Sequence, residues 1–357
     1  MALVQPFRAV RYDEAKAGPL ESLVAPPYDV LGPEERAEYL ARSPYNVVRL
    51  TLPDSEEEAA RDWRAWREEG VLVHEPESSY WALEQDYEGP DGVARTRTGL
   101  VASLRVEPYE RRIVLPHERT HRGPKEGRLR LLRAVRAQLE SIFLLYDAAR
   151  PFVTPARPPE LELADARLWR LPDDGIREEF AELQLLIADG HHRYETALAF
   201  HEAEGTPESA FMPVVLVSTR DPGLTIFPTH RVAEHLEGYE AEPNGHLSAA
   251  LEALEAKPRD RPAVLVYRRG GRVSLLEGER GLDTAYAESL GPEGVTYTPR
   301  VEEAVEAVET GRAEAALLVR PPRIEDVFAV AQAGETMPQK STYFYPKLLS
   351  GLLFHPV

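Results

Sequence analysis

The chain has 357 residues, no cysteine and a formal net charge of −18 at pH 7. A length above the usual single-domain size predicts two domains, or one large domain with an inserted module. The acidic balance argues against a nucleic-acid or anionic-membrane binder, and the lack of cysteine excludes disulfides, thiolate metal sites and cysteine nucleophiles.

The first 150 residues alternate between helix and strand signals. In chain order, the spacing of apolar residues and the turn residues predict a helix over 33–42, a strand over 46–52, a helix over 55–70, a hairpin of strands 80–87 and 96–106, a helix from residue 125, and a buried strand over 141–146.

After a proline-rich connector over 151–159, the chain continues with further α/β signals. These are a strand over 167–171, a helix over 174–182, a strand-turn-helix that begins at Leu185, and strands over 212–218 and 224–228. No membrane-length apolar segment occurs, and we expect a cytoplasmic protein.

The pattern changes between residues 238 and 322, where we expect a separate small α/β module. Its predicted elements are a helix over 245–256, strands over 263–267 and 272–276, helices over 283–290 and 301–310, and a strand over 315–319. The expected fold class is α/β (α+β mixed). We expect residues 1–237 to form a core with a mixed sheet and an N-terminal extension, and residues 323–357 to return to the core site.

An apolar run that ends in a glycine turn and restarts as a helix is the most informative feature. Asp189 and Gly190 form the turn, and His191, His192 and Arg193 are the first residues of the predicted helix. A helix N-terminus has unpaired N–H groups and about half a positive charge. Extra donors and cations at that end favour a bound anion such as phosphate.

Two other interpretations of the same motif stay open. The residues could form a capped helix with exposed polar side chains. A zinc site could use His191 and Glu195, which are four residues apart on one helix face, but a third ligand is not evident. If the phosphate interpretation holds, Arg193→Ala should abolish a nucleotide response and leave the melting temperature of the ligand-free protein nearly unchanged.

A basic segment lies between residues 117 and 130 of this acidic chain. His117, Glu118 and Lys125 are its candidate site residues: His117 and Lys125 for phosphate, and Glu118 as a general base or metal carboxylate. From Lys125 onward, a solvated helix face with paired charges is the favoured alternative.

Three shorter segments offer similar groups. A Pro-Pro turn presents Tyr28 and Asp29, and an apolar strand ends at Thr229, His230 and Arg231. The third segment, residues 337–347, is rich in polar and aromatic residues and supplies Lys340 and Ser341. Each could also be an ordinary loop anchor.

At these segments the chain resembles the bacterial and archaeal family catalogued as domain of unknown function 1015. The resemblance rests on Pro26 to Val30, His117-Glu118 with Thr120 and Pro124-Lys125, Ala188 to Ala197, Pro228 to Arg231, and Met337 to Lys347. It spans nearly the whole chain.

The Asp-Gly-His-His-Arg element is also similar to the signature of the ParB/sulfiredoxin-like superfamily, which includes free-serine kinases. This likeness implies a ParB/sulfiredoxin-like core in which Asp189, Gly190, His191, His192 and Arg193 bind the phosphates of ATP or ADP. It also implies Mg²⁺, with Asp189 as its candidate ligand. Because the sulfiredoxin cysteine has no counterpart, that activity is not expected.

These inferences lead to a nucleotide-dependent phosphotransferase that acts on a small hydroxylated metabolite, with free L-serine as the first choice. Glu118, Asp29 and His192 are the expected catalytic residues, and Lys125, Arg231 and Lys340 are secondary phosphate contacts. The alternative is a nucleotide-binding regulatory or protein-interaction module of ParB type. A nuclease ranks lowest, because no two-metal carboxylate cluster is evident. The sequence leaves a homo-oligomer open.

Overall fold

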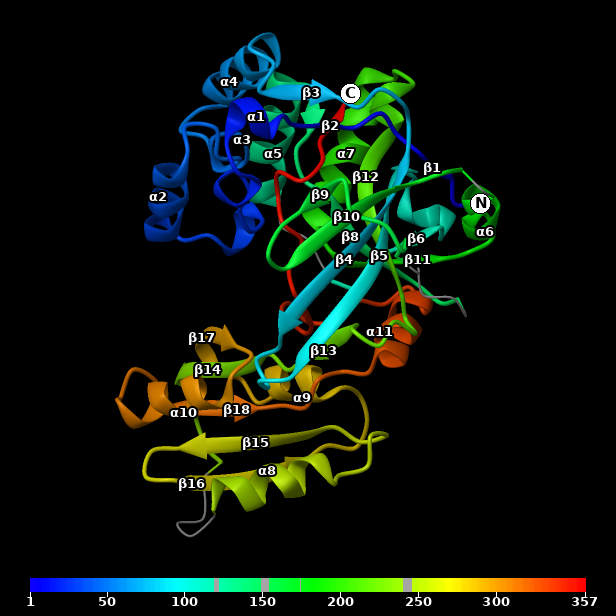
Figure 1. Cartoon of the computed structure of the whole chain (residues 1–357). Coiled ribbons are helices and arrows are strands. Elements are labelled where there is room, and N and C mark those ends of the chain that lie inside the picture. Colours follow the sequence, from blue (N-terminus) through cyan, green and yellow to red (C-terminus); the bar gives the residue numbers. More distant parts are fainter. Residues whose placement is uncertain (119–121, 149–153, 174, 240–245) are drawn as a thin grey trace.

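The computed structural model describes residues 1–118, 122–148, 154–173, 175–239 and 246–357. Parts of the predicted connector over 151–159, of the helices expected from 174 and 245, and of the basic segment (119–121) lie outside them. The expected mixed α/β class is confirmed, because helices flank sheets with both parallel and antiparallel strand pairs. Figure 1 shows a larger upper part and a smaller lower part.

The N-terminal segment consists mainly of short helices that cover one face of the larger sheet. Its elements are β1 (Val4–Gln5), β2 (Val10–Tyr12), α1 (Glu14–Ala17), η1 (Leu20–Ser22), η2 (Tyr28–Val30), α2 (Pro33–Arg42), α3 (Val48–Thr51), α4 (Glu56–Glu68) and β3 (Leu72–His74). The predicted helices over 33–42 and 55–70 are confirmed. Ser55 accepts a hydrogen bond from the backbone N–H of Glu58 at 3.2 Å and so begins α4.

The strand expected over 46–52 is wrong, because this segment forms the short helix α3. The Asn46 side chain explains the difference: its Oδ1 accepts from the N–H of Val48 at 3.0 Å, and its amide donates to the carbonyl of Ser22 at 2.8 Å. Side-chain bonds of this kind favour the start of a helical turn. The apolar residues that suggested a strand are buried in the core instead.

The larger part is built on a nine-stranded mixed sheet. Its strands run in the order β6-β11-β8-β12-β5-β4-β10-β9, and β1 pairs with β5. Their bounds are β4 (Tyr80–Glu88), β5 (Ala94–Arg105), β6 (Val114–Leu115), β8 (Ile142–Tyr146), β9 (Leu161–Glu162), β10 (Ala166–Leu171), β11 (Leu185–Asp189) and β12 (Phe211–Ser218). The predicted hairpin is confirmed as β4 and β5.

Both faces of this sheet are buried, as β12 shows. Met212, Val214 and Leu216 point into one apolar cluster, and Val215 and Val217 point into the other. The remaining elements of this part are η3 (Tyr109–Arg111), α5 (Arg122–Val135), β7 (Ala137–Gln138), α6 (Ile176–Phe180), α7 (His191–Glu204), η4 (Glu208–Ala210) and β20 (His355–Pro356). Burial on two faces explains why β12 is almost continuously apolar in sequence.

The smaller part is a five-stranded sheet with the order β16-β15-β18-β14-β17. Its elements are β14 (His230–His235), α8 (Leu247–Glu255), β15 (Ala263–Arg268), β16 (Arg272–Glu277), α9 (Asp283–Ser289), β17 (Glu293–Thr298), α10 (Val301–Glu309) and β18 (Ala315–Leu318). Helices α8 and α10 pack on one face and α9 on the other. Because β14 belongs to this sheet, we propose that the module begins near residue 230, upstream of the expected 238.

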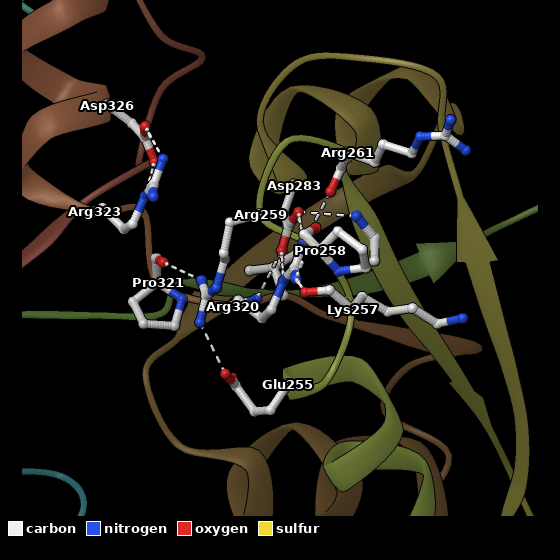
Figure 2. A network of polar contacts seen from close by, with 12 residues as sticks. Glu255, Lys257, Pro258, Arg259, Arg261, Asp283, Arg320, Pro321, Arg323 and Asp326 are labelled. Carbon is white, nitrogen blue, oxygen red and sulfur yellow. Dashed lines mark hydrogen bonds and ion pairs between the residues drawn. The ribbon is translucent and has the colours of Figure 1, made fainter.

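A buried ion pair holds three segments of the module together (Figure 2). Arg320 donates to the Asp283 carboxylate from Nε at 2.7 Å and from Nη2 at 2.8 Å, and its Nη1 donates to the carbonyl of Lys257 at 2.7 Å. The Asp283 carboxylate also accepts from the N–H of Ala263 at 2.8 Å. One buried pair therefore joins α9, the start of β15 and the segment after β18.

The C-terminal segment leads back from the module to the larger part (Figure 1). Helix α11 (Ile324–Gln332) packs on the larger core, and β19 (Tyr343–Tyr345) pairs with β13 (Thr225–Phe227). Strand β13 directly precedes the module. Among the described residues, no helix combines the length and the apolar character needed to cross a bilayer.

Candidate functional site

The turn between β11 and α7 exposes the N-terminus of α7 without a cap. Gly190 is the N-cap with φ 100°, no side chain caps the helix, and the first turn holds no acidic residue. A Cβ at Gly190 would lie 2.6 Å from Cγ2 of Ile142, so both backbone conformation and space require glycine here. The end of a helix of 14 residues thus keeps its positive potential.

This helix end opens into a pocket that collects four separate segments of the chain. Its volume of about 110 Å³ gives room for several water molecules or a phosphate group. Its lining residues are Tyr28, Asp29, Glu118, Asp189, Gly190, His191, His192, Arg193, Gln339 and Lys340. Eight of these were expected site residues, and Tyr28 belongs to the turn that was expected to present it.

Asp189 is held between two cations beside the pocket. Its Oδ1 lies 2.5 Å from Nζ of Lys347, and its Oδ2 lies 2.6 Å from Nη2 of Arg193. Arg193 also donates from Nη1 to the carbonyl of Ser141 at 2.7 Å. Burial alone would raise the pKa of Asp189, but the charges of Lys347 and Arg193 outweigh it and hold that pKa well below its ordinary value.

His117 and His191 lie against each other beside the turn, and both are neutral. His117 is fully buried, its Nδ1 lies 2.7 Å from the carbonyl of Ile187, and its Nε2 lies 2.9 Å from Oγ1 of Thr342. Nδ1 must carry the proton, because a carbonyl can only accept. Nε2 of His191 accepts from the backbone N–H of His117 at 3.3 Å.

Burial is the largest cause that lowers the pKa of both imidazoles, and for His191 the neighbouring His117 lowers it further. These rings therefore contribute hydrogen bonds and not charge. Positive charge at the pocket comes from Arg193, Lys340, the nearby Lys347 and the helix end.

Two carboxylates lie on the other walls of the pocket. Glu118 accepts from the backbone N–H of Ser341 at 3.2 Å, which ties it to the C-terminal segment. Asp29 lies in the turn η2 after two prolines. The pocket therefore combines a cationic helix end with two acidic side chains.

A buried carboxylate supports the turn that carries Asp29. Glu140 accepts from the N–H of Tyr28 at 3.2 Å and from the Ser350 hydroxyl at 2.9 Å, and it forms an ion pair with Arg128. The Arg128 guanidinium lies 3.9 Å from the centre of the Tyr28 ring. The sequence did not predict this group of contacts, because the residues in it are far apart in the chain: Tyr28 and Ser350 are separated by 322 positions.

Several expected site residues do not line the pocket. Lys125 forms an ion pair with Glu195, the second proposed zinc ligand. The Ser341 hydroxyl donates to the carbonyl of Pro338 at 2.7 Å within its own turn. His117 lies behind the pocket wall, with its ring 4.7 Å from that of His191.

The remaining expected residues, Thr229, His230 and Arg231, lie at the entrance to the module. Arg231 is fully buried and donates from Nη1 to the carbonyl of Thr229 at 2.6 Å. Within the described chain, Oγ1 of Thr229, Nε2 of His230 and Nη2 of Arg231 have no hydrogen-bond partner. Burial, followed by the charge of Arg231, lowers the pKa of His230 to about 4.

Asp189 is a poor magnesium ligand in this arrangement, because each of its oxygens already pairs with a cation. No group of three His, Asp or Glu side chains in the described ranges could hold a metal ion by itself. Mg²⁺ is commonly held by one or two carboxylates together with substrate phosphates. Asp29 and Glu118 fit that requirement better than Asp189 does.

Comparisons with known proteins identify a family but no activity. A family model described as a protein of unknown function (DUF1015) matches residues 4–301. Among curated proteins, no relative matches the chain.

Solved structures give weak likenesses. A free serine kinase variant in complex with AMP is 16% identical with a TM-score of 0.40, over 65% of this chain and 84% of that one. A conserved hypothetical protein from Pyrococcus furiosus is 16% identical with a TM-score of 0.38, over 65% of this chain and 87% of that one. C-terminally truncated SbnI from Staphylococcus aureus is 14% identical with a TM-score of 0.32, over 69% of this chain and 84% of that one. TM-scores this low carry no weight for the site, and the ParB/sulfiredoxin-like core stays a prediction.

Proposed function

We propose that this chain, which belongs to the DUF1015 family of proteins of unknown function, binds nucleotide phosphates at the N-terminus of α7 and transfers a phosphoryl group to a small hydroxylated metabolite. One observation carries the proposal. The uncapped end of α7 opens into a pocket that has cations at that end and two carboxylates on its other walls. Phosphoryl transfer needs both kinds of group in one place.

The cationic end suits the phosphates of ATP or ADP. Backbone N–H groups of the first turn of α7 would donate to phosphate oxygens, and Lys340 would add a mobile positive charge. Neutral His191 would donate from Nδ1, and His192 lines the same wall. Arg193 would act mainly through its field, because two of its nitrogens already donate to protein oxygens.

The carboxylates suit the acceptor. Glu118 or Asp29 would accept the hydroxyl proton as the hydroxyl oxygen forms its bond to phosphorus, while the bond from phosphorus to the departing nucleotide oxygen breaks. Mg²⁺ would neutralise phosphate charge, held by Asp29 or Glu118 together with the phosphates. L-serine is the first acceptor to test, because of the resemblance of the Asp189–Arg193 motif to that of free-serine kinases.

The direct test is turnover. Purified protein with Mg²⁺, L-serine and a panel of ATP, ADP, CTP and pyrophosphate should yield phosphoserine with at least one donor. Glu118→Gln and Asp29→Asn should each lower kcat, by about 100-fold or more for whichever acts as the base. Glu302→Gln, on the exposed first turn of α10, is the matched control.

Binding is tested separately by melting. A nucleotide at 100 times its Kd should stabilise the protein by about 2.7 kcal/mol. If nucleotide binds and no acceptor in a panel of hydroxylated metabolites is phosphorylated, the chain is a nucleotide-binding regulatory protein, the alternative that the sequence left open. If neither binding nor turnover is seen, the proposed function is wrong.

A further inference from the structure

Lys347 contacts Asp189 across 158 residues of sequence and was not an expected site residue. The residue before it is held firmly: Arg97 donates from Nη2 to the carbonyl of Pro346 at 2.8 Å and to Oε1 of Gln85 at 2.6 Å. Arg97 is itself buried and lies 4.5 Å from the centre of the Phe143 ring. The backbone that carries Lys347 is thus fixed from inside the core.

The charges of Asp189 and its two ion-pair partners do not cancel. Lys347 and Arg193 each carry one positive charge and Asp189 carries one negative charge, so the three side chains have a net charge of +1. Their side chains are only 21%, 7% and 16% exposed, so water screens this excess weakly. Without Lys347, the charge of Asp189 would cancel that of Arg193, and the two remaining side chains would have no net charge.

We propose that Lys347 is a positioning residue of the phosphate end: it neutralises Asp189, so that Arg193 and the N-terminus of α7 act on a bound anion without opposition from the Asp189 carboxylate. This rests on the proposed function, because it assigns the ligand of that end as a multiply charged phosphate. Asp189 is the last residue of β11 and pairs with Arg193 in the first turn of α7, whereas Lys347 makes the net charge of this cluster positive. The effect of Lys347 should therefore grow with the charge of the ligand.

A purely structural role makes a different prediction, which a double-mutant cycle can separate. The net charge of the cluster is +1 in the native protein, 0 in Lys347→Met, +2 in Asp189→Asn, and +1 again in the double variant. If charge governs binding, Asp189→Asn should rescue Lys347→Met. If the ion pair only holds the fold together, the double variant should bind no better than the worse single variant.

The experiment measures Kd for ATP, ADP and adenosine by calorimetry in EDTA, with each variant first checked for a cooperative melt. We expect Lys347→Met to weaken ATP by about tenfold or more and ADP by less, with adenosine within about twofold. Lys347→Arg and the double variant should stay within about threefold of the native protein for ATP. If Lys347→Met does not fold, the comparison of Asp189→Asn with the double variant decides: ATP should bind more tightly to Asp189→Asn.

A matched control is Lys257→Met in the module, where Nζ lies 2.5 Å from Oε1 of Glu277. This variant removes the same type of ion pair at the same distance and should leave ATP affinity unchanged. Equal losses for ATP and adenosine in Lys347→Met, or failure of Asp189→Asn to rescue it, would overturn the role of Lys347 while leaving the proposed function intact. A native protein that binds neither ATP nor ADP, in EDTA or with Mg²⁺, would overturn both.

Discussion

Removal of the Asp283 carboxylate from the module should be among the most destabilising single changes in this chain. The Asp283 and Arg320 side chains are 7% and 1% exposed, and Asp283→Ala would leave the Arg320 guanidinium buried with only carbonyl partners (Figure 2). Loss of one partner from a buried pair costs about 3–5 kcal/mol. Asp283→Ala should therefore lower the free energy of opening of the module by about that amount.

A pair on the segment that follows the module supplies a control with lower burial. Arg323 and Asp326 also form a two-contact pair, at 2.8 and 2.7 Å, but their side chains are 53% and 25% exposed. Exposed pairs contribute about 0–1 kcal/mol. Asp326→Ala should therefore change the opening of the module by less than about 1 kcal/mol.

Native-state hydrogen exchange followed by mass spectrometry is the suitable assay, because it measures opening locally. All four tryptophans, Trp63, Trp66, Trp81 and Trp169, lie in the larger part, so tryptophan fluorescence would not report on the module. Peptides from β15 and β18 should lose protection in Asp283→Ala, and peptides from β12 should not. If β15 and β18 lose no more protection in Asp283→Ala than in Asp326→Ala, the reasoning that burial makes the Asp283–Arg320 pair costly to break is refuted.

Two further predictions concern the core site and acid sensitivity. Arg193→Met should remove the nucleotide-induced rise in melting temperature. It should also lower the unfolding free energy of the ligand-free protein by about 3–5 kcal/mol, because Asp189 and the Ser141 carbonyl each lose a hydrogen bond from a charged donor. An unchanged melting temperature of the ligand-free variant, as the sequence alone led us to expect, would contradict this buried pairing. His230 and His355 both have pKa values that burial lowers to about 4, so the folded protein binds fewer protons than the unfolded chain below pH 6.5. Above that pH both histidines are neutral in the folded and the unfolded protein, and they do not make stability depend on pH. Between pH 7 and pH 5, each histidine lowers the free energy of unfolding by about 2 kcal/mol. Urea unfolding at both pH values should show a smaller acid loss in His230→Gln/His355→Gln, and an equal loss would contradict neutral buried imidazoles.

Local signals in the sequence were sufficient where the structure is governed by near neighbours. The glycine turn at Gly190 and the cap at Ser55 follow from residues within a few positions, as do strands β4 and β5. The prediction for 46–52 was wrong because Asn46 bonds to the Ser22 carbonyl, 24 residues away. Strands β14 and β17 and helix α11 had no predicted counterpart, and β17 is largely exposed, so its sequence has little apolar alternation to detect.

The sequence by itself determined that a glycine turn joins β11 to α7 and that polar and cationic residues begin this helix, because a turn and a helix start depend on consecutive residues. The structure then showed that no side chain caps the helix. Only the tertiary structure decided which of those residues carry charge toward the pocket. Burial and the backbone N–H of His117 make His191 neutral, and Lys347 compensates Asp189 from the far end of the chain. Protonation and charge balance depend on what surrounds a group in three dimensions, and those surroundings are not contained in any short segment.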